Sequence, residues 1–110
     1  MYLPPADMRK GFDGLSGLIT AKLNRDPMDG RVYIFVNRRR DRIKLLLWDR
    51  TGLILFYKRL EKGTFEIPVD ESISGGVTLS WEVLVMMLEG YSLRGIERRK
   101  RYKKQRSGLG

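Results

Sequence analysis

Arginine and lysine are the side chains whose spacing in this sequence points to chemistry. Four arginines crowd positions 38 to 42, and further cations follow at positions 44, 58 and 59. A planar guanidinium can donate two hydrogen bonds to one phosphate group, so such a cluster suits nucleic acid. The alternative is a charged turn that discourages pairing between strand edges. The residues expected to contact phosphate here are Arg38, Arg39, Arg40, Arg42, Lys44, Lys58 and Arg59.

A second concentration of cations occupies residues 94–110, here called the basic arm. It holds eight Lys and Arg and one acid, Glu97, within a 110-residue chain whose formal net charge is +9. Runs of like charge repel themselves and commonly bind nucleic acid, although a solubilising tail or a membrane-surface patch is an alternative. We expect a flexible arm that contacts DNA through Arg94, Arg98, Arg99, Lys100, Arg101, Lys103, Lys104 and Arg106.

The composition narrows the catalytic chemistry open to this chain. It contains no His and no Cys, which excludes histidine-based dyads, thiolate catalysis and cysteine-ligated metals. Acids at positions 7, 13, 41 and 49 could hold Mg²⁺ in a nuclease, but each also suits a helix start or a turn. We therefore expect a non-enzyme without cofactor or metal, with a metal-dependent nuclease as the less favoured alternative.

Two helices are expected to flank the middle of the chain. Apolar residues at 15, 18, 19 and 23 recur at helical spacing and predict an amphipathic helix over residues 13–24. A second helix is expected from 80 to 89, with Ser80 as its N-cap and Leu79 and Leu84 spaced as a hydrophobic staple. Residues 69–77 have the composition of a loop.

Segments rich in β-branched and aromatic residues lie between the helices. Residues 31–37, 42–49 and 53–60 are joined by short polar links typical of antiparallel hairpins, and 64–67 predicts a short fourth strand. The first and third segments are apolar on both faces, which requires cover on both. Either the second face packs on a partner, which would make a homo-oligomer possible, or both helices lie on one side and leave aromatic rings partly exposed.

These elements predict an α+β fold, a three- to four-stranded antiparallel meander with an N-terminal and a C-terminal helix packed on it. Residues 1–93 would form one domain, followed by the basic arm. The longest apolar run has six residues and the N-terminus lacks a basic region followed by an apolar one, so we expect no membrane association or secretion. The expected location is the bacterial cytoplasm, on the nucleoid when bound to DNA.

Three blocks of sequence carry a family resemblance. The first spans residues 6–15, the second runs from 41 to 65, and the third covers 79–90. In this order they resemble the small TnpB-type accessory protein encoded by the second reading frame of insertion sequence sixty-six elements. The residues of its motifs in this chain are Asp7, Met8, Arg9, Lys10, Gly11, Phe12, Asp13, Trp48 and Asp49.

The resemblance implies a protein that assists a separate transposase during DNA transposition and carries no established catalytic activity. We expect the partners to be DNA and the transposase of the same element. A DNA-binding accessory protein is the favoured function, and a protein–protein adaptor for the transposase is the alternative. Among the motif residues, Trp48 is expected to support the fold, at a cost of about 3–5 kcal/mol on truncation to Ala if its ring is buried.

Overall fold

The computed structural model describes residues 1–67, 76 and 78–89 of the chain. The predicted loop 69–77, apart from Gly76, and the basic arm lie outside these described residues. Within residues 1–67 and 78–89, neither helix has the length and apolarity of a membrane span.

The N-terminal helix, α1, spans Phe12–Lys22 and confirms the prediction, although it begins one residue earlier and ends two residues earlier than expected. Leu15 and Ile19 are completely buried, as the helical spacing of the apolar residues requires. The helix contains Gly14, where an added Cβ would lie 3.0 Å from two carbons of the Lys10 side chain. This glycine therefore lets the preceding turn pack closely on the helix.

The sheet has three antiparallel strands in the order β1-β2-β3. Its strands are β1 (Tyr33–Val36), β2 (Arg42–Trp48) and β3 (Leu53–Arg59). Tyr33 pairs with Leu46 across β1 and β2, and Arg42 pairs with Arg59 across β2 and β3. Since side chains directly opposite each other share a face, this register determines which residues meet on each side of the sheet.

The predicted fourth strand is wrong. Residues 64–67 join no ladder, and the sheet of the described chain has three strands. Instead, the Phe65 N–H donates a 2.6 Å hydrogen bond to the Arg40 carbonyl in the β1–β2 turn, and the Phe65 ring is buried. Gly63, with φ +79°, turns the chain just before this contact. Residues 64–67 therefore pack against the end of the sheet that carries the β1–β2 turn.

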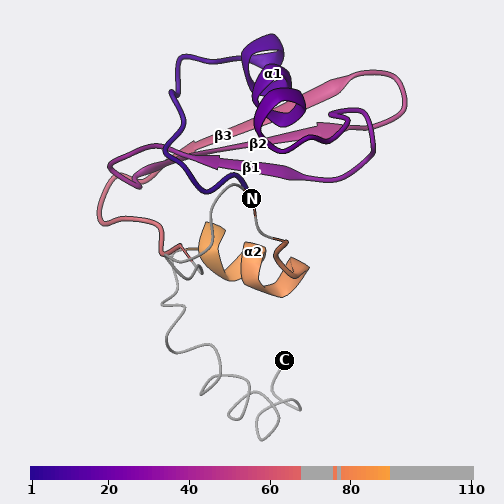
Figure 1. Ribbon diagram of the computed structural model, residues 1–110. Helices are drawn as coiled ribbons and strands as arrows, with labels where there is room; N and C mark the ends of the chain where they lie inside the picture. The colour runs from indigo at the N-terminus through magenta and orange to yellow at the C-terminus, as the bar shows by residue number, and fades with distance from the viewer. Residues whose placement is uncertain (68–75, 77, 90–110) are drawn as a thin grey trace, which may run out of the picture.

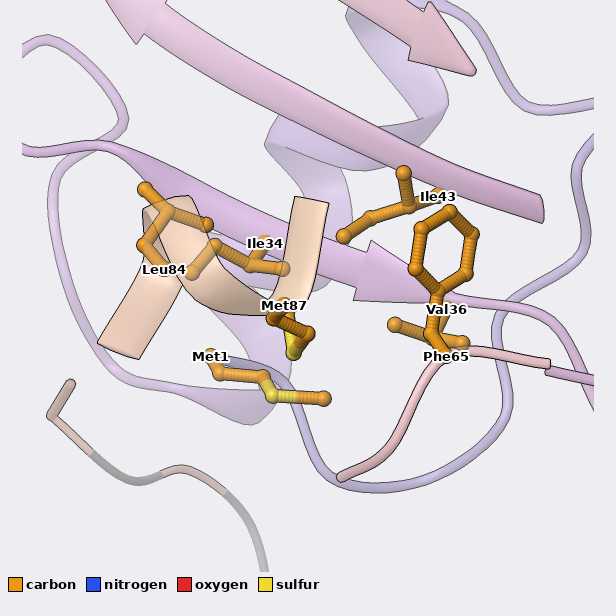
Figure 2. Close-up of a cluster of buried hydrophobic side chains, with 7 residues drawn as sticks. All are labelled: Met1, Ile34, Val36, Ile43, Phe65, Leu84 and Met87. Atoms are coloured by element: carbon orange, nitrogen blue, oxygen red, sulfur yellow. The ribbon is translucent and has the colours of Figure 1, made fainter. Parts of the chain in front are cut away.

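The two faces of the sheet are covered by different helices (Figure 1). One face packs against α1 through a cluster of Tyr2, Ala6, Leu15, Ile19, Tyr33, Phe35 and Leu46. The other face packs against α2 (Trp81–Leu88) through Met1, Ile34, Val36, Ile43, Phe65, Leu84 and Met87 (Figure 2). Of the two alternatives, the one with both helices on one side is therefore wrong, and the sheet separates two cores.

The two edges of the sheet differ in what covers them. Along β1, the N–H groups of Tyr2 and Ala6 donate 2.9 Å hydrogen bonds to the carbonyls of Ile34 and Val36. The N-terminal segment thus closes that edge. In the described part of the chain no other segment pairs with β3, whose Ile54, Phe56 and Tyr57 side chains are 45–48% exposed. This edge is open.

Candidate nucleic-acid interface

The β1–β2 turn presents the first three predicted phosphate ligands, Arg38, Arg39 and Arg40, and all three are exposed. Asn37 builds the turn, because its Oδ1 accepts hydrogen bonds from the N–H groups of Asp41 and Arg42 at 3.1 and 3.0 Å. Arg40 has φ +59°, which is uncommon outside glycine. A tight backbone therefore holds three guanidinium groups in solvent.

Asp41 supports the same turn from its other side. Its carboxylate accepts a 2.7 Å hydrogen bond from the Asn37 amide, which lowers the pKa of Asp41, with the nearby charges of Arg39 and Arg42 acting in the same direction. The Asp41 carbonyl also accepts a hydrogen bond from the Leu60 N–H at 2.7 Å. These two hydrogen bonds of Asp41 hold the turn together. This structural role accounts for the aspartate at position 41.

Arg42 and Arg59 extend the positive surface onto the sheet. They lie directly opposite each other across β2 and β3, a placement that is unfavourable for like charges. Arg42 donates a 3.4 Å hydrogen bond to the Tyr57 hydroxyl, and Arg59 forms an exposed ion pair of 3.0 Å with Glu61, which raises the pKa of Arg59. An exposed ion pair contributes little to stability, so the pair with Glu61 does not offset the repulsion between Arg42 and Arg59. An anion bound between the two arginines would relieve this repulsion.

These residues form one group at one end of the sheet. We call it the arginine cluster, and its members are Arg38, Arg39, Arg40, Arg42 and Arg59.

Lys44 does not belong to this group, although the sequence analysis predicted it to contact phosphate. Only 6% of the residue is exposed, and its ammonium donates hydrogen bonds to the carbonyls of Met8 and Lys10 at 2.6 and 2.9 Å. The same nitrogen lies 4.5 Å from the centre of the Tyr57 ring, a cation–π distance. The structure therefore gives Lys44 internal partners and no surface for a phosphate.

Lys58 is also turned inward, on the opposite face of the sheet. Its ammonium donates a 2.6 Å hydrogen bond to the carbonyl of Leu88, the last residue of α2. A cation at a helix C-terminus meets the unpaired carbonyls and the negative end of the helix dipole. Lys58 thus fastens α2 to β3, a role that the sequence analysis did not foresee.

The first family motif, residues 7–13, forms the turn that leads into α1 and closes over Lys44. Asp7 accepts four hydrogen bonds of 2.8–3.1 Å from Arg9, which lower the pKa of Asp7 to about 2. Met8 and Lys10 contribute their carbonyls to Lys44, Gly11 is the N-cap of α1, and Asp13 lies in its first turn. These residues act through local structure, whereas Phe12 is 47% exposed.

The second pair of motif residues lies at the β2–β3 turn. Asp49 accepts hydrogen bonds from the N–H groups of Thr51 and Gly52 at 3.3 and 3.2 Å, as turn aspartates commonly do. Trp48 ends β2 and is partly exposed. Its ring is not fully buried, so the condition for the larger loss of stability on truncation is not met.

A cleft of about 670 Å³ lies at the opposite end of the sheet from the arginine cluster. Among its lining residues are the cations Lys22, Arg25 and Arg31, and the exposed ring of Trp81. Arg31 lies 3.7 Å from Asp29, so part of this charge is balanced. No group of three or more acids in the described residues could hold a metal ion. The cleft is a second, weaker concentration of positive charge.

The predicted ligands of the basic arm lie outside the described residues, so their contacts stay a prediction. Asn37 is the functional residue that the sequence analysis missed. The feature of the sequence that indicates this role is an asparagine between a strand and a polar link, a position where the Asn side chain commonly stabilises a turn.

Comparison with known proteins identifies the family of this chain. The model of the family described as IS66 Orf2-like protein matches residues 1–98. The uncharacterized proteins y4jC and y4hO of Sinorhizobium fredii are 33% and 34% identical to it over 95 and 88 residues. These alignments cover 86% and 80% of this chain, and 80% and 75% of the relatives. No solved structure matches. The chain therefore belongs to the IS66 Orf2-like family, and its role is that of an accessory protein in the transposition of an insertion sequence.

Proposed function

We propose that this accessory protein binds DNA through phosphate contacts made by the arginine cluster, with the basic arm adding further contacts. The observation that carries the proposal is the β1–β2 turn, where Asn37 holds three exposed arginines that form no ion pair with another of the described residues. Arg42 and Arg59, placed opposite each other, continue the positive surface. Phosphate contacts position a protein on the DNA backbone and do not distinguish bases, so the affinity of this protein should be similar for different DNA sequences.

The test is a fluorescence-anisotropy titration of duplex DNA at several salt concentrations. Arg38→Gln, Arg39→Gln and Arg40→Gln are combined in one variant, and Lys22→Gln, Arg25→Gln and Arg50→Gln in a control of equal net charge. The control cations are exposed and lie at the other end of the sheet. Each phosphate contact contributes about −0.9 to the log–log salt slope, so loss of the turn arginines should flatten the slope by about 2–3.

The control variant separates a local contact from general attraction. We expect it to keep a salt slope close to that of the wild type. Equal losses in both variants would show that net charge alone drives binding, and a larger loss in the control would move the interface to the cleft. Either result would overturn the arginine cluster as the site.

The basic arm is tested in the full chain by replacing Arg98, Arg99, Lys100 and Arg101 with Gln. If five of its charges contact B-DNA, the arm alone accounts for a slope of about −4 to −5. Removing four should flatten the measured slope by about 3–4 and weaken binding to element-end and unrelated DNA alike. An unchanged slope would leave DNA binding to the arginine cluster alone.

A protein–protein adaptor for the transposase is the second candidate function. The observation that favours it is the ring of Trp81, which is 70% exposed at the start of α2, because tryptophan often dominates binding energy at protein interfaces. An adaptor should bind the transposase equally well when the turn arginines are replaced, and should lose affinity on Trp81→Ala. If the protein instead binds DNA, replacing the turn arginines should weaken its affinity for DNA, and Trp81→Ala should leave that affinity unchanged.

A further inference from the structure

The open edge of β3 has the chemistry of a surface that pairs with another strand. Its first five residues, 53–57, are uncharged and its two cations, Lys58 and Arg59, come at its end, whereas exposed strand edges are usually protected along their length by lysine, proline or a bulge. Ile54, Phe56 and Tyr57 are among the large apolar side chains with the greatest exposure in the described structure. The β1 edge, in contrast, is closed by Tyr2 and Ala6.

From these features we propose that two copies of the chain associate through their β3 edges, forming a continuous six-stranded antiparallel sheet. The occupant of the edge is thus a second copy of the same strand. The association uses main-chain groups and apolar side chains, so it does not rest on DNA binding. Because each copy has one open edge among the described residues, the pairing is closed at two copies and does not propagate into a fibre.

The alternation of hydrogen-bonded pairs along the β2–β3 ladder supports this pairing. The Asp49 N–H donates to the Gly52 carbonyl and the Leu60 N–H to the Asp41 carbonyl, one at each end of the β2–β3 ladder. Hydrogen-bonded pairs alternate along an antiparallel ladder, so residues 54, 56 and 58 direct their main-chain groups to β2. The main-chain groups of Leu53, Leu55, Tyr57 and Arg59 therefore point outward, and no other strand of the described residues pairs with them.

One register satisfies these groups and the side chains together. A two-fold axis through Leu55 pairs each Leu55 with its copy and each Leu53 with Tyr57 of the second copy. Side chains of opposite residues share a face, so Ile54 meets Phe56 of the second copy, a favourable β-branched and aromatic pair. Both of these side chains are nearly half exposed in the single chain, at 47% and 45%.

Charge favours the same register. With the axis at Leu55, Arg59 lies opposite Thr51 of the second copy, beyond the apolar centre. Lys58 is already turned to the Leu88 carbonyl on its own chain and lies opposite Gly52 of the second copy. An axis moved to Phe56 would instead set Lys58 opposite Ile54 and Arg59 opposite Leu53. The first register therefore keeps both cations of β3 away from the apolar contact.

The experiment is analytical ultracentrifugation of the full chain, without DNA, from about 1 to 100 µM. The wild type should sediment with the mass of a dimer at the upper end of this range. Ile54→Glu and Phe56→Lys should each weaken the dimer at least tenfold, because each places a charge opposite an apolar residue. Phe12→Lys and Met28→Glu are the matched controls, since both residues are similarly exposed and lie far from β3 in the sequence.

Mixing the two β3 variants tests the register directly. In a mixed dimer the new carboxylate at position 54 faces the new ammonium at position 56, so association should recover at least fivefold over either variant alone. Circular dichroism and thermal melting establish that each variant is folded. A wild type that is monomeric throughout, assemblies larger than a dimer, β3 variants that associate as tightly as the controls, or no recovery on mixing would overturn the proposal.

Discussion

A buried ammonium needs hydrogen-bond acceptors, and for Lys44 these are two main-chain carbonyls in the turn that precedes α1. The carbonyls of Met8 and Lys10 lie more than thirty positions away in the sequence, so this lysine ties the turn before α1 to the centre of β2. The Tyr57 ring covers the same charge from β3. One side chain thereby joins three segments of the fold.

Replacement of Lys44 by Met should therefore cost stability and leave DNA binding intact. Two part-buried carbonyls would lose their donor, at a cost of about 1–3 kcal/mol in the free energy of unfolding measured by urea titration. Lys62→Met, at an exposed lysine, should change that free energy by no more than about 0.5 kcal/mol. Unchanged stability combined with weaker DNA affinity would restore Lys44 to the phosphate-binding residues.

Tyr33 makes the stability of the fold depend on alkaline pH. Burial raises the pKa of Tyr33 to about 12, and the 2.5 Å hydrogen bond from its hydroxyl to Asp29 acts in the same direction. The folded state therefore holds the phenolic proton more tightly than the unfolded state, whose pKa is near 10. This contribution is complete below pH 10 and is lost as the pH rises towards 12.

Urea titrations at pH 9 and pH 11 should show a larger loss of stability in the wild type than in Tyr33→Phe. Other tyrosines and the lysines titrate in both proteins, so the difference between the two losses isolates Tyr33. Equal losses would mean that the Tyr33 hydroxyl ionises as it does in the unfolded chain.

At the scale of elements, α2 is a short helix that depends on its ends. Eight residues are too few for a helix to persist alone, so caps and packing must hold it. At its N-terminus the Ser80 hydroxyl accepts a 3.2 Å hydrogen bond from the Val83 N–H, which confirms the predicted cap. At its C-terminus the Lys58 ammonium binds the Leu88 carbonyl.

Ser80→Ala should lower the free energy of unfolding by about 1 kcal/mol, because it removes the acceptor for an N–H group at the helix start. Ser80→Asp should retain most of that stability, since aspartate caps helices as well as serine does. Chemical denaturation of the three proteins provides the measurement. A loss of the same size in Ser80→Asp would show that the hydroxyl acts through packing and not as a cap.

At the scale of the whole molecule, the sheet divides the buried side chains of the described residues into two cores, and none of these side chains belongs to both. Ile19 lies in the core beneath α1 and Ile43 in the core beneath α2, and both are fully buried. Each core holds seven buried side chains, so uncovering either face of the sheet would expose about half of the buried apolar side chains of these two clusters. Stability is therefore a property of the sandwich as a unit.

Ile19→Val and Ile43→Val should each cost about 0.5–1.5 kcal/mol, and the double variant should lose the sum of the two within about 0.5 kcal/mol. Residues without shared contacts act independently, which a double-mutant cycle of unfolding free energies measures. A larger coupling energy would show that the backbone of the sheet transmits strain between the cores.

Local signals predicted much of this architecture. The apolar stripe of α1, the three hairpin-linked strands and the Ser80 cap each follow from neighbouring residues, which is why their types and approximate bounds are confirmed. The staple is also consistent, since Leu79 packs against the core that buries Leu84. The fourth strand was wrong because the Phe65 N–H bonds to the carbonyl of Arg40, a contact distant in the sequence.

The candidate site was predictable only in part. Alternation along β2 places Lys44 on the face of buried Leu46, but the carbonyls that satisfy its charge come from the N-terminal turn. Composition cannot distinguish such a lysine from one on the surface. The exposed turn arginines, in contrast, follow from their place in a short polar link between strands.

The internal position of Lys44 has a consequence for chemical modification. Amine-reactive reagents acylate lysines that meet solvent, so Lys10, Lys22 and Lys62 should be modified early and Lys44 late. Its acylation requires the turn over residues 8–10 to separate from the sheet, a partial opening of the kind that hydrogen exchange detects. The labelling rate of this one amine, read by mass spectrometry, therefore reports how often the N-terminal segment lifts away while the rest of the sheet stays folded.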